Sequence, residues 1–318
     1  MNVNDINTPI LPIYQYQLQF NVEGKIRLPE FAGSAWRGAF GHALKKTVCV
    51  VRDTACISCM LKTSCAYSYV FETPPPSKSD KMRKYTASPH PFILQFPLNE
   101  SLEQQKYALN MTLFGHGERF FPYIVHAMKK AGQDGMGSSR QVFELDTISQ
   151  NSSLKGEEVI YQNGQLQNQL AANEMDIPAM PEQIKIIIHT PIRIKKDGHN
   201  LNQVYFNFAA FFGNILRRIS MLTYFHTDTP LETNFAELMQ RAKQIHFKHK
   251  ELSWYDWKRY SSRQKTEMNM GGVIGLLQLD SEGMEDFWPY LWLGQWTHAG
   301  KATSMGLGHY SIDMTSLS

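Results

Sequence analysis

A stretch near the C-terminus combines glycines, a lysine and hydroxyl side chains in a pattern that suits phosphate. It begins at His298 and contains Gly300, Lys301, Gly306 and Gly308. Glycine lets a backbone approach a ligand closely and adopt positive φ angles. Backbone N–H groups in such a loop, with a lysine beside them, suit phosphate oxygens. The pattern therefore predicts a loop that binds a phosphate group.

All four cysteines of the chain lie close together, with the spacing Cys49-x6-Cys56-x2-Cys59-x5-Cys65. This spacing resembles a metal ligand set. The CxxC pair places two thiolates on one knuckle, and the flanking cysteines can complete a tetrahedron. We favour structural zinc; an iron–sulfur cluster, which four thiolates also suit, and free thiols are the alternatives.

Length and composition limit the class of protein. The chain has 318 residues, of which 42% are hydrophobic and 19% charged, which suits two ordinary domains or one large one. A net charge of +3 permits a nucleic-acid partner but does not require one. No apolar run approaches the length of a membrane span, and the N-terminus lacks the features of a secretion signal. We therefore expect a cytoplasmic protein with no membrane partner.

The first half of the chain predicts one βαββαβ unit. Alternating apolar residues predict a strand over 14–20, and an apolar face that includes Trp36 and Phe40 predicts a helix over 33–48. This order of elements is that of the ferredoxin-like unit, with the cysteine knuckle (49–65) inserted after its first helix. The remaining expected elements are strands at 92–96 and 107–113, a helix at 118–131 and a strand near 141–145.

The second half repeats this pattern. Residues 151–181 are polar and end in prolines, which predicts a linker with a small hairpin at Asn163-Gly164. The further expected elements are strands at 184–188, 245–250, 257–261 and 271–277, helices at 202–225 and 286–296, and a closing strand. Gly135-Met136-Gly137 and Gly306-Leu307-Gly308 follow corresponding helices, which suggests a duplicated unit. We therefore predict an α+β fold of tandem ferredoxin-like domains, with domains at 1–150 and 182–318.

Four stretches together resemble one known family, the CRISPR repeat-processing endoribonucleases of the RAMP superfamily, in a subgroup with a zinc knuckle. They span most of the chain in the right order and are residues 36–44, residues 135–143, residues 259–264 with 271–275, and residues 298–308. The resemblance implies tandem ferredoxin-like domains. It also implies metal-independent cleavage within the repeat of precursor CRISPR RNA, so that any metal at the cysteines is structural.

The implied reaction turns the RNA 2′-OH on its adjacent phosphate and leaves a 2′,3′-cyclic phosphate and a 5′-OH. It needs a base, an acid and positive charge near the phosphorane. We expect His42, on the first helix one turn from Gly38, to transfer the proton, because histidine titrates near neutral pH. Lys45 is the candidate for charge stabilisation. His298 is the rival histidine; its alternative role is to anchor the loop.

RNA contacts are expected in three places. Arg37 lies on the first helix. Arg259, Tyr260 and Arg263 combine guanidinium charge with an aromatic ring, which suits phosphates and unstacked bases, although an ordinary exposed strand is the alternative. The third place is the C-terminal loop, through Gly300, Lys301, Gly306 and Gly308. The aromatic run from Tyr205 to Phe212 is expected in the core.

Two other functions fit the same sequence. A non-catalytic RAMP subunit that holds guide RNA would share the fold and the glycine loop. A zinc-dependent DNA-binding or scaffold protein is the second alternative. The expected partner is the repeat of precursor CRISPR RNA; a CRISPR effector complex and a second copy of the chain are further hypotheses.

Overall fold

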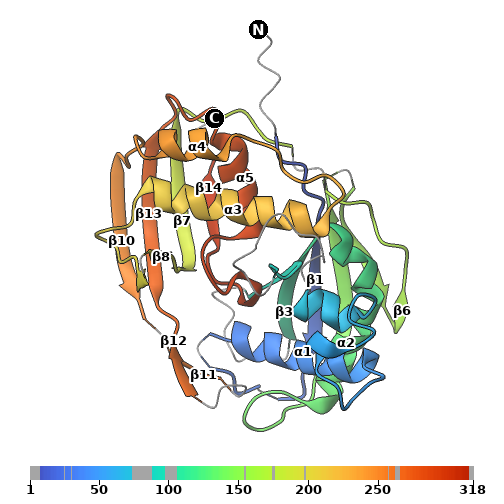
Figure 1. Ribbon diagram of the computed structural model, residues 1–318. Coiled ribbons are helices and arrows are strands. Elements are labelled where there is room, and N and C mark those ends of the chain that lie inside the picture. The colour runs from blue at the N-terminus through green and yellow to red at the C-terminus, as the bar shows by residue number, and fades with distance from the viewer. Residues whose placement is uncertain are drawn as a thin grey trace. The chain divides into compact units, whose positions relative to one another are not determined.

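The computed structural model describes residues 8–24, 26–29, 31–73, 88–96, 106–153, 155–173, 176–196, 198–256, 258–261 and 266–314 (Figure 1). The chain divides into two compact units, which are described separately. The N-terminal unit comprises Leu11–Glu174 and Tyr224–Asp228, and the C-terminal unit comprises Met1–Ile10, Met175–Thr223 and Thr229–Ser318. Among the described residues, no helix has the length and apolar character needed to cross a membrane.

The N-terminal unit contains the predicted βαββαβ order. Its strands pair antiparallel in the order β2-β3-β1-β4, which is the arrangement of a ferredoxin-like sheet. The elements are β1 (Ile13–Asn21), α1 (Gly33–Val48), β2 (Phe92–Gln95), β3 (Lys106–Phe114), α2 (Phe121–Asp134) and β4 (Glu144–Ser152).

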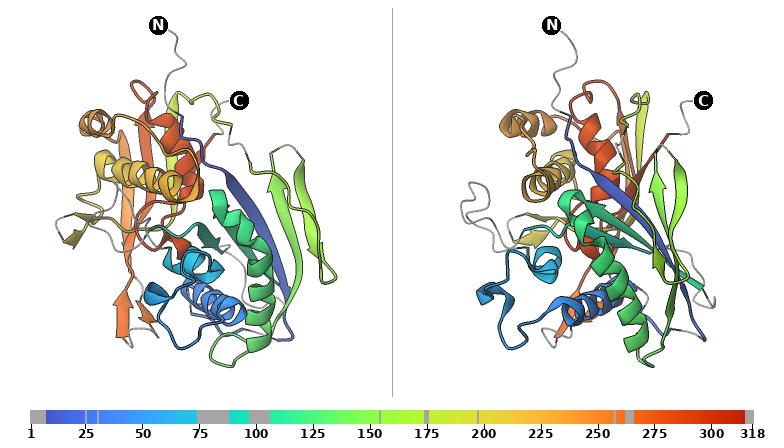
Figure 2. Two further views of the ribbon diagram at one scale, coloured as in Figure 1. Left: turned by 45° about the vertical axis from the view of Figure 1, so that its right-hand side comes forward. Right: turned by 90° about the vertical axis from the view of Figure 1, so that its right-hand side faces the viewer.

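Helices α1 and α2 lie side by side against one face of this sheet (Figures 1 and 2). The alternation in β1 turns Leu18 and Phe20 into the core, where both are 0% exposed. The Phe20 ring lies 5.0 Å from Trp36 of α1 and 5.3 Å from Phe143, measured between ring centroids. The apolar face of α1 is thereby buried, and its opposite face stays exposed.

The stretch expected as a linker is partly a continuation of the first sheet. β5 (Gly156–Gln162) pairs with β4, and β6 (Gln165–Leu166) pairs with β5. The expected hairpin turn is present, because Asn163 and Gly164 take φ angles of 53° and 78°. The prediction of a linker over the whole of 151–181 is therefore wrong for these strands, whose many glutamates and glutamines disguise an edge hairpin.

The C-terminal unit repeats the topology, with antiparallel strands in the order β10-β13-β7-β14. The strand expected at 257–261 is β11, and its pairing with β12 was not expected; nor were the short hairpin β8–β9 and the helix α4. The elements are β7 (Gln183–Ile192), β8 (Lys195–Lys196), β9 (His199–Asn200), α3 (Phe208–His226), α4 (Phe235–Ala242), β10 (His249–Tyr255), β11 (Lys258–Ser261), β12 (Thr266–Asn269), β13 (Gly272–Asp280), α5 (Trp288–Thr297) and β14 (Tyr310–Asp313).

Helix α3 begins six residues later than the sequence pattern indicates. Phe208, Phe211 and Phe212 are buried as expected, and Phe212 packs edge-on against Phe287 at 4.8 Å between ring centroids. Tyr205 belongs instead to a turn before the helix and is exposed. The apolar period alone could not place the start of the helix, because the turn also contains aromatic residues.

Candidate functional site

The glycine loop, residues 298–309, joins α5 to β14. At several of its glycines the backbone leaves no room for a side chain. Positive φ angles occur at His298, Gly300, Ala302, Gly306 and Gly308. A Cβ atom on Gly308 would lie 1.8 Å from the Ala299 carbonyl oxygen, and one on Gly300 would lie 2.8 Å from the Arg193 carbonyl oxygen. These glycines therefore shape the loop by permitting close backbone packing.

The N–H groups of this loop are largely used inside the protein. Lys301 N donates to Arg193 O at 3.0 Å, Gly308 N to Pro191 O at 3.1 Å, and Gly306 N to Thr303 O at 2.8 Å. Thr190 Oγ1 donates to Gly306 O at 2.8 Å. The expectation that these backbone amides bind phosphate is therefore wrong at these three positions. The loop is fixed to the end of β7, and its exposed contribution is the Lys301 side chain.

Lys301 lies among other cations. Partial burial lowers the pKa of Lys301, and the positive charges of Lys195, Arg193 and Arg217 lower it further. Lys301 lies on the loop, Lys195 on β8 and Arg217 on α3, and Arg193 directly follows β7; all four belong to the C-terminal unit. We call them the cation cluster. Its chemistry suits an anion with several oxygens, because like charges that share a small region are stabilised by a polyanionic ligand.

His298 is placed as an anchor of the loop. Its side chain is 1% exposed, and its Nδ1 lies 3.0 Å from the Leu307 carbonyl oxygen. Burial is the main reason that the pKa of His298 lies well below the ordinary value. A ring that is enclosed and bonded to backbone is not positioned to exchange a proton with RNA, so the structure favours the anchoring role over the catalytic one.

Sequence reasoning missed a stack of three histidines under the loop. His309 lies between His189 and His298, at centroid distances of 4.9 Å and 5.1 Å. Burial and the neighbouring His189 lower the pKa of His309 to about 4. The stack is therefore uncharged at neutral pH and holds the start of the loop against β7. No spacing rule connects three residues so far apart in the chain.

The exposed face of α1 carries the other predicted catalytic residues. Gly38, His42 and Lys45 fall on one stripe of the helix, and all three are exposed. A Cβ atom on Gly38 would meet no described atom within 4 Å. Lys45 Nζ lies 5.5 Å from the centroid of the Tyr67 ring, which orients its charge. This stripe is an accessible surface that pairs an imidazole with an ammonium group.

Arg37 is held beside this stripe by contacts that the sequence did not reveal. Its Nη2 donates to Nε2 of His90 at 2.7 Å, and its guanidinium carbon lies 5.2 Å from the centroid of the Phe71 ring. Phe71 can pack on α1 because residue 41 is glycine, where a Cβ atom would lie 2.9 Å from the Phe71 ring. The arginine is therefore oriented by an aromatic ring and by a histidine that accepts its hydrogen bond.

The four cysteines come into one neighbourhood without forming a metal centre. Cys49, Cys59 and Cys65 line a hollow of about 380 Å³. Burial raises the pKa of the Cys56 thiol, against the opposing effect of Lys45. All four are free thiols, and no group of three or more His, Cys, Asp or Glu in the described part of the chain could hold a metal ion. The donor set suits zinc but its arrangement does not, so the predicted zinc site is not supported.

For the predicted RNA contacts at Arg259, Tyr260 and Arg263, the structure describes at most the backbone. Arg259 and Tyr260 lie on β11, whose backbone pairs with β12, and their side chains are not among those described. Arg263 lies outside the described residues altogether. Their RNA-binding role stays a prediction from the sequence.

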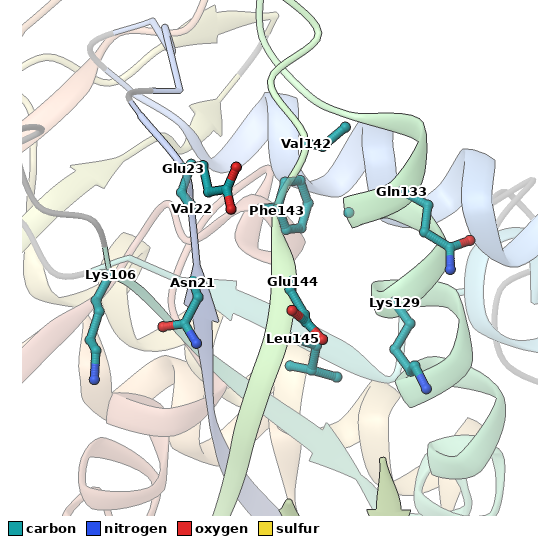
Figure 3. A pocket seen from close by; sticks show the side chains of 11 residues that line it. Asn21, Val22, Glu23, Lys106, Lys129, Gln133, Val142, Phe143, Glu144 and Leu145 are labelled. Atoms are coloured by element: carbon teal, nitrogen blue, oxygen red, sulfur yellow. The ribbon is translucent and has the colours of Figure 1, made fainter. Parts of the chain in front are cut away.

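A larger hollow, of about 660 Å³, opens in the N-terminal unit between α2 and neighbouring strand ends (Figure 3). Lys106, Asn21 and Glu144 occupy adjacent strands there, and Lys129 comes from α2. Its lysines are accompanied by Glu23 and Glu144, so it lacks the positive character of the cation cluster. No predicted site residue lines this hollow.

Comparisons with known proteins agree with this architecture. Residues 11–175 match the AF_1859 N-terminal domain, and residues 186–310 match the CRISPR-associated endoribonuclease Cas6. An uncharacterized protein of Archaeoglobus fulgidus is 24% identical over 178 residues, which are 52% of this chain and 60% of that protein. The match thus spans about three-fifths of that relative.

Solved structures show the same fold. A Cas6 product complex matches with a TM-score of 0.58 and 14% identity, over 95% of this chain and 100% of that chain. Cas6 of Thermus thermophilus matches with a TM-score of 0.54 and 14% identity, over 96% of this chain and 99% of that chain. A partial Cas6-RT-Cas1–Cas2 complex matches with a TM-score of 0.58 and 14% identity, over 97% of this chain and 47% of that chain.

The AF_1859 N-terminal domain matches just over half of the chain, so the chain belongs to the proteins that contain this domain. Residues 186–310 match the Cas6 family of CRISPR-associated endoribonucleases, which is the family that the sequence resembles, and the chain has the tandem ferredoxin-like fold of the solved Cas6 structures.

Proposed function

We propose that this protein cleaves precursor CRISPR RNA within the repeat, without a metal ion. The 2′-oxygen forms a bond to the adjacent phosphorus, and the bond from phosphorus to the 5′-oxygen breaks. One group takes the proton of the 2′-OH and another gives a proton to the 5′-oxygen. The products are a 2′,3′-cyclic phosphate and a 5′-OH.

The observation that carries this proposal is the exposed stripe on α1. His42 is accessible, has Gly38 one turn away, and has Lys45 on the same stripe. The glycine leaves room for an RNA backbone beside the imidazole. We assign His42 as the general acid or base, a role that contributes typically about 10²–10⁴-fold in rate. Lys45 and the oriented guanidinium of Arg37 supply positive charge to the phosphorane.

His90 acts through Arg37 and is therefore a positioning residue. Its Nε2 accepts from the guanidinium at 2.7 Å. Replacing His90 with Gln keeps an acceptor, whereas Leu removes it. We expect His90→Leu to lower the single-turnover rate with little change in RNA affinity, and His90→Gln to restore much of that rate. A double-mutant cycle with Arg37→Ala measures the coupling.

RNA binding is assigned mainly to the C-terminal unit. Lys301, on the glycine loop, belongs to the cation cluster, for which phosphate oxygens are the complementary ligand. Gly300, Gly306 and Gly308 act by shaping the loop. Arg259, Tyr260 and Arg263 remain assigned to RNA binding on the strength of their residue types. A CRISPR effector complex and a second copy of the chain remain hypotheses as partners.

The test uses the repeat RNA encoded beside the gene, and a copy with a single 2′-deoxy nucleotide at the scissile position. We expect the unaltered protein to cut the RNA and to bind, without cutting, the deoxy copy. His42→Ala should cut at least about 100-fold more slowly at unchanged affinity. His126→Ala, which changes an exposed histidine of α2, is the matched control. Binding of the repeat without any cleavage would support the non-catalytic guide-RNA subunit instead.

A further inference from the structure

A turn of the C-terminal unit presents two large apolar side chains to solvent. Val204 is 66% exposed and Tyr205 is 69% exposed, and both lie between β9 and α3. The neighbouring Phe206 is 1% exposed. Burial of one aromatic residue and exposure of the adjacent one follow from the course of the turn, and exposure of Tyr205 brings no gain in folding free energy.

The turn is rigidly built. Asn202 Oδ1 accepts from the N–H groups of Val204 at 3.1 Å and of Tyr205 at 3.2 Å, and Asn202 O accepts from Phe206 N at 3.0 Å. The Phe206 ring packs on Phe211 at a centroid distance of 5.8 Å, which fixes the turn to the core. Tyr205 is therefore presented in one place with its backbone already ordered, which reduces the entropic cost of binding a ligand.

A lysine from another element adds positive charge to this turn. Lys250 Nζ, on β10, donates to Val204 O and to Phe206 O, each at 3.1 Å. The two acceptors are the carbonyl oxygens on either side of Tyr205, so the ammonium group lies beside the backbone of the turn that presents this tyrosine. An ammonium has three donors and these bonds use two of them. Lys248 and His249, which precede Lys250, are also exposed but lie next to carboxylates, Lys248 at 2.8 Å from Asp280 and His249 at 3.8 Å from Glu251, so Lys250 is the cation assigned to this turn.

We propose that Tyr205 and Lys250 form a binding site for one unpaired nucleotide of RNA. The base stacks on the Tyr205 ring and its phosphate pairs with the Lys250 ammonium. Stacking on an aromatic residue tolerates any base, whereas the adjacent cation selects a ligand that carries an anion. That combination favours a nucleotide over an apolar protein segment. The source of the nucleotide, the CRISPR repeat RNA, rests on the proposed function.

The experiment measures binding of the uncleavable 2′-deoxy repeat RNA, with 2-aminopurine placed at each unpaired position in turn. We expect one position to be quenched by the unaltered protein and by Tyr205→Phe, but not by Tyr205→Ala. Tyr205→Ala should also weaken affinity about 5- to 150-fold. The matched control is Tyr123→Ala, because Tyr123 is a tyrosine of α2 that is 50% exposed; it should change neither quenching nor affinity.

Lys250 gives a second measurement. Lys250→Gln should make the negative slope of log affinity against log salt concentration shallower by about 0.7, which is the value for one phosphate contact on a single strand. Lys250→Arg should restore it. Equal affinity and equal quenching for Tyr205→Ala and the unaltered protein would overturn the site. Binding with the expected quenching but no cleavage of ordinary repeat RNA would overturn the proposed function and leave the site standing.

Discussion

The glycine loop of the C-terminal unit and the cysteine loop of the N-terminal unit, residues 49–65, differ in how they are held. Leu307 of the glycine loop is 0% exposed, whereas Ile57 and Met60 of the cysteine loop are 85% and 87% exposed. The glycine loop is fastened by backbone bonds to β7. The described bonds of the cysteine loop are short-range turns, such as Cys59 N to Cys56 O at 3.2 Å.

This difference has a physical origin. Glycines act through the backbone, so the role of a glycine pattern is visible in the folded chain as backbone packing that leaves no room for a Cβ atom. Cysteines of a ligand set act through their side chains, and a bound metal ion is needed to bring those side chains together. A glycine motif can therefore be checked by steric fit, whereas a cysteine motif remains a hypothesis about a ligand.

The largest effect is expected when a side chain is placed in the glycine loop. Gly308→Ala should destabilise the protein by about 3–5 kcal/mol, because its Cβ would lie 1.8 Å from Ala299 O. Gly156→Ala is the matched control: Gly156 has a similar φ of 75°, but its Cβ would have no described atom within 4 Å. We expect a cost of about 1 kcal/mol there. Urea unfolding compares the two, and equal costs would refute the steric account.

The histidine stack makes the stability of the C-terminal unit depend on pH. The pKa of His309 is about 4 in the fold, against 6.5 as the ordinary value. Between these values the unfolded chain binds the proton and the folded chain does not, so stability is complete above pH 6.5 and falls as the pH drops toward 4. The loss approaches about 1.4 kcal/mol per pH unit.

The melting temperature, measured from pH 7 to pH 4, tests this expectation. His309→Phe keeps an aromatic ring between His189 and His298 but cannot titrate. We expect the unaltered protein to lose stability relative to this variant as the pH falls. Parallel curves for the two proteins would show that His309 has an ordinary pKa.

A smaller effect is expected on RNA affinity. Lys301→Ala should weaken binding of repeat RNA about 10-fold, and should reduce the salt dependence by roughly one phosphate contact. Lys62→Ala is the control from the cysteine loop, since Lys62 is also an exposed lysine. If Lys62→Ala weakened binding as much as Lys301→Ala, RNA affinity would reflect overall charge rather than the cation cluster.

The smallest effect is expected at the cysteines. Because the structure describes free thiols, EDTA and a Cys56→Ser substitution should each change the melting temperature by no more than a few degrees, which corresponds to about 1 kcal/mol or less. Metal analysis accompanies the melting curves. One equivalent of zinc, lost together with a large fall in melting temperature, would restore the zinc site that the cysteine spacing predicts.

The sequence predicted those features that depend on local periodicity or steric freedom. The bounds of α1 were predicted at Gly33 and Val48, and the order of both sheets followed from the βαββαβ pattern. It could not show the Arg37–His90 contact or the histidine stack, because these join residues distant in the chain. It offered His298 as a candidate for proton transfer, because the burial that encloses this ring results from tertiary packing and cannot be read from the sequence. It predicted the turn at Asn163-Gly164 but not that β5 pairs with β4, because charged and amide residues suit a hairpin at the side of a sheet as well as a linker.

The central claim is metal-independent cleavage of the CRISPR repeat by 2′-OH attack. The most direct test is to incubate the unaltered protein with its cognate repeat RNA in EDTA and to map both new ends. The account predicts a single cut that leaves a 2′,3′-cyclic phosphate on one fragment and a 5′-OH on the other. A 3′-OH with a 5′-phosphate, or cleavage that appears only when a divalent metal is returned, would contradict it.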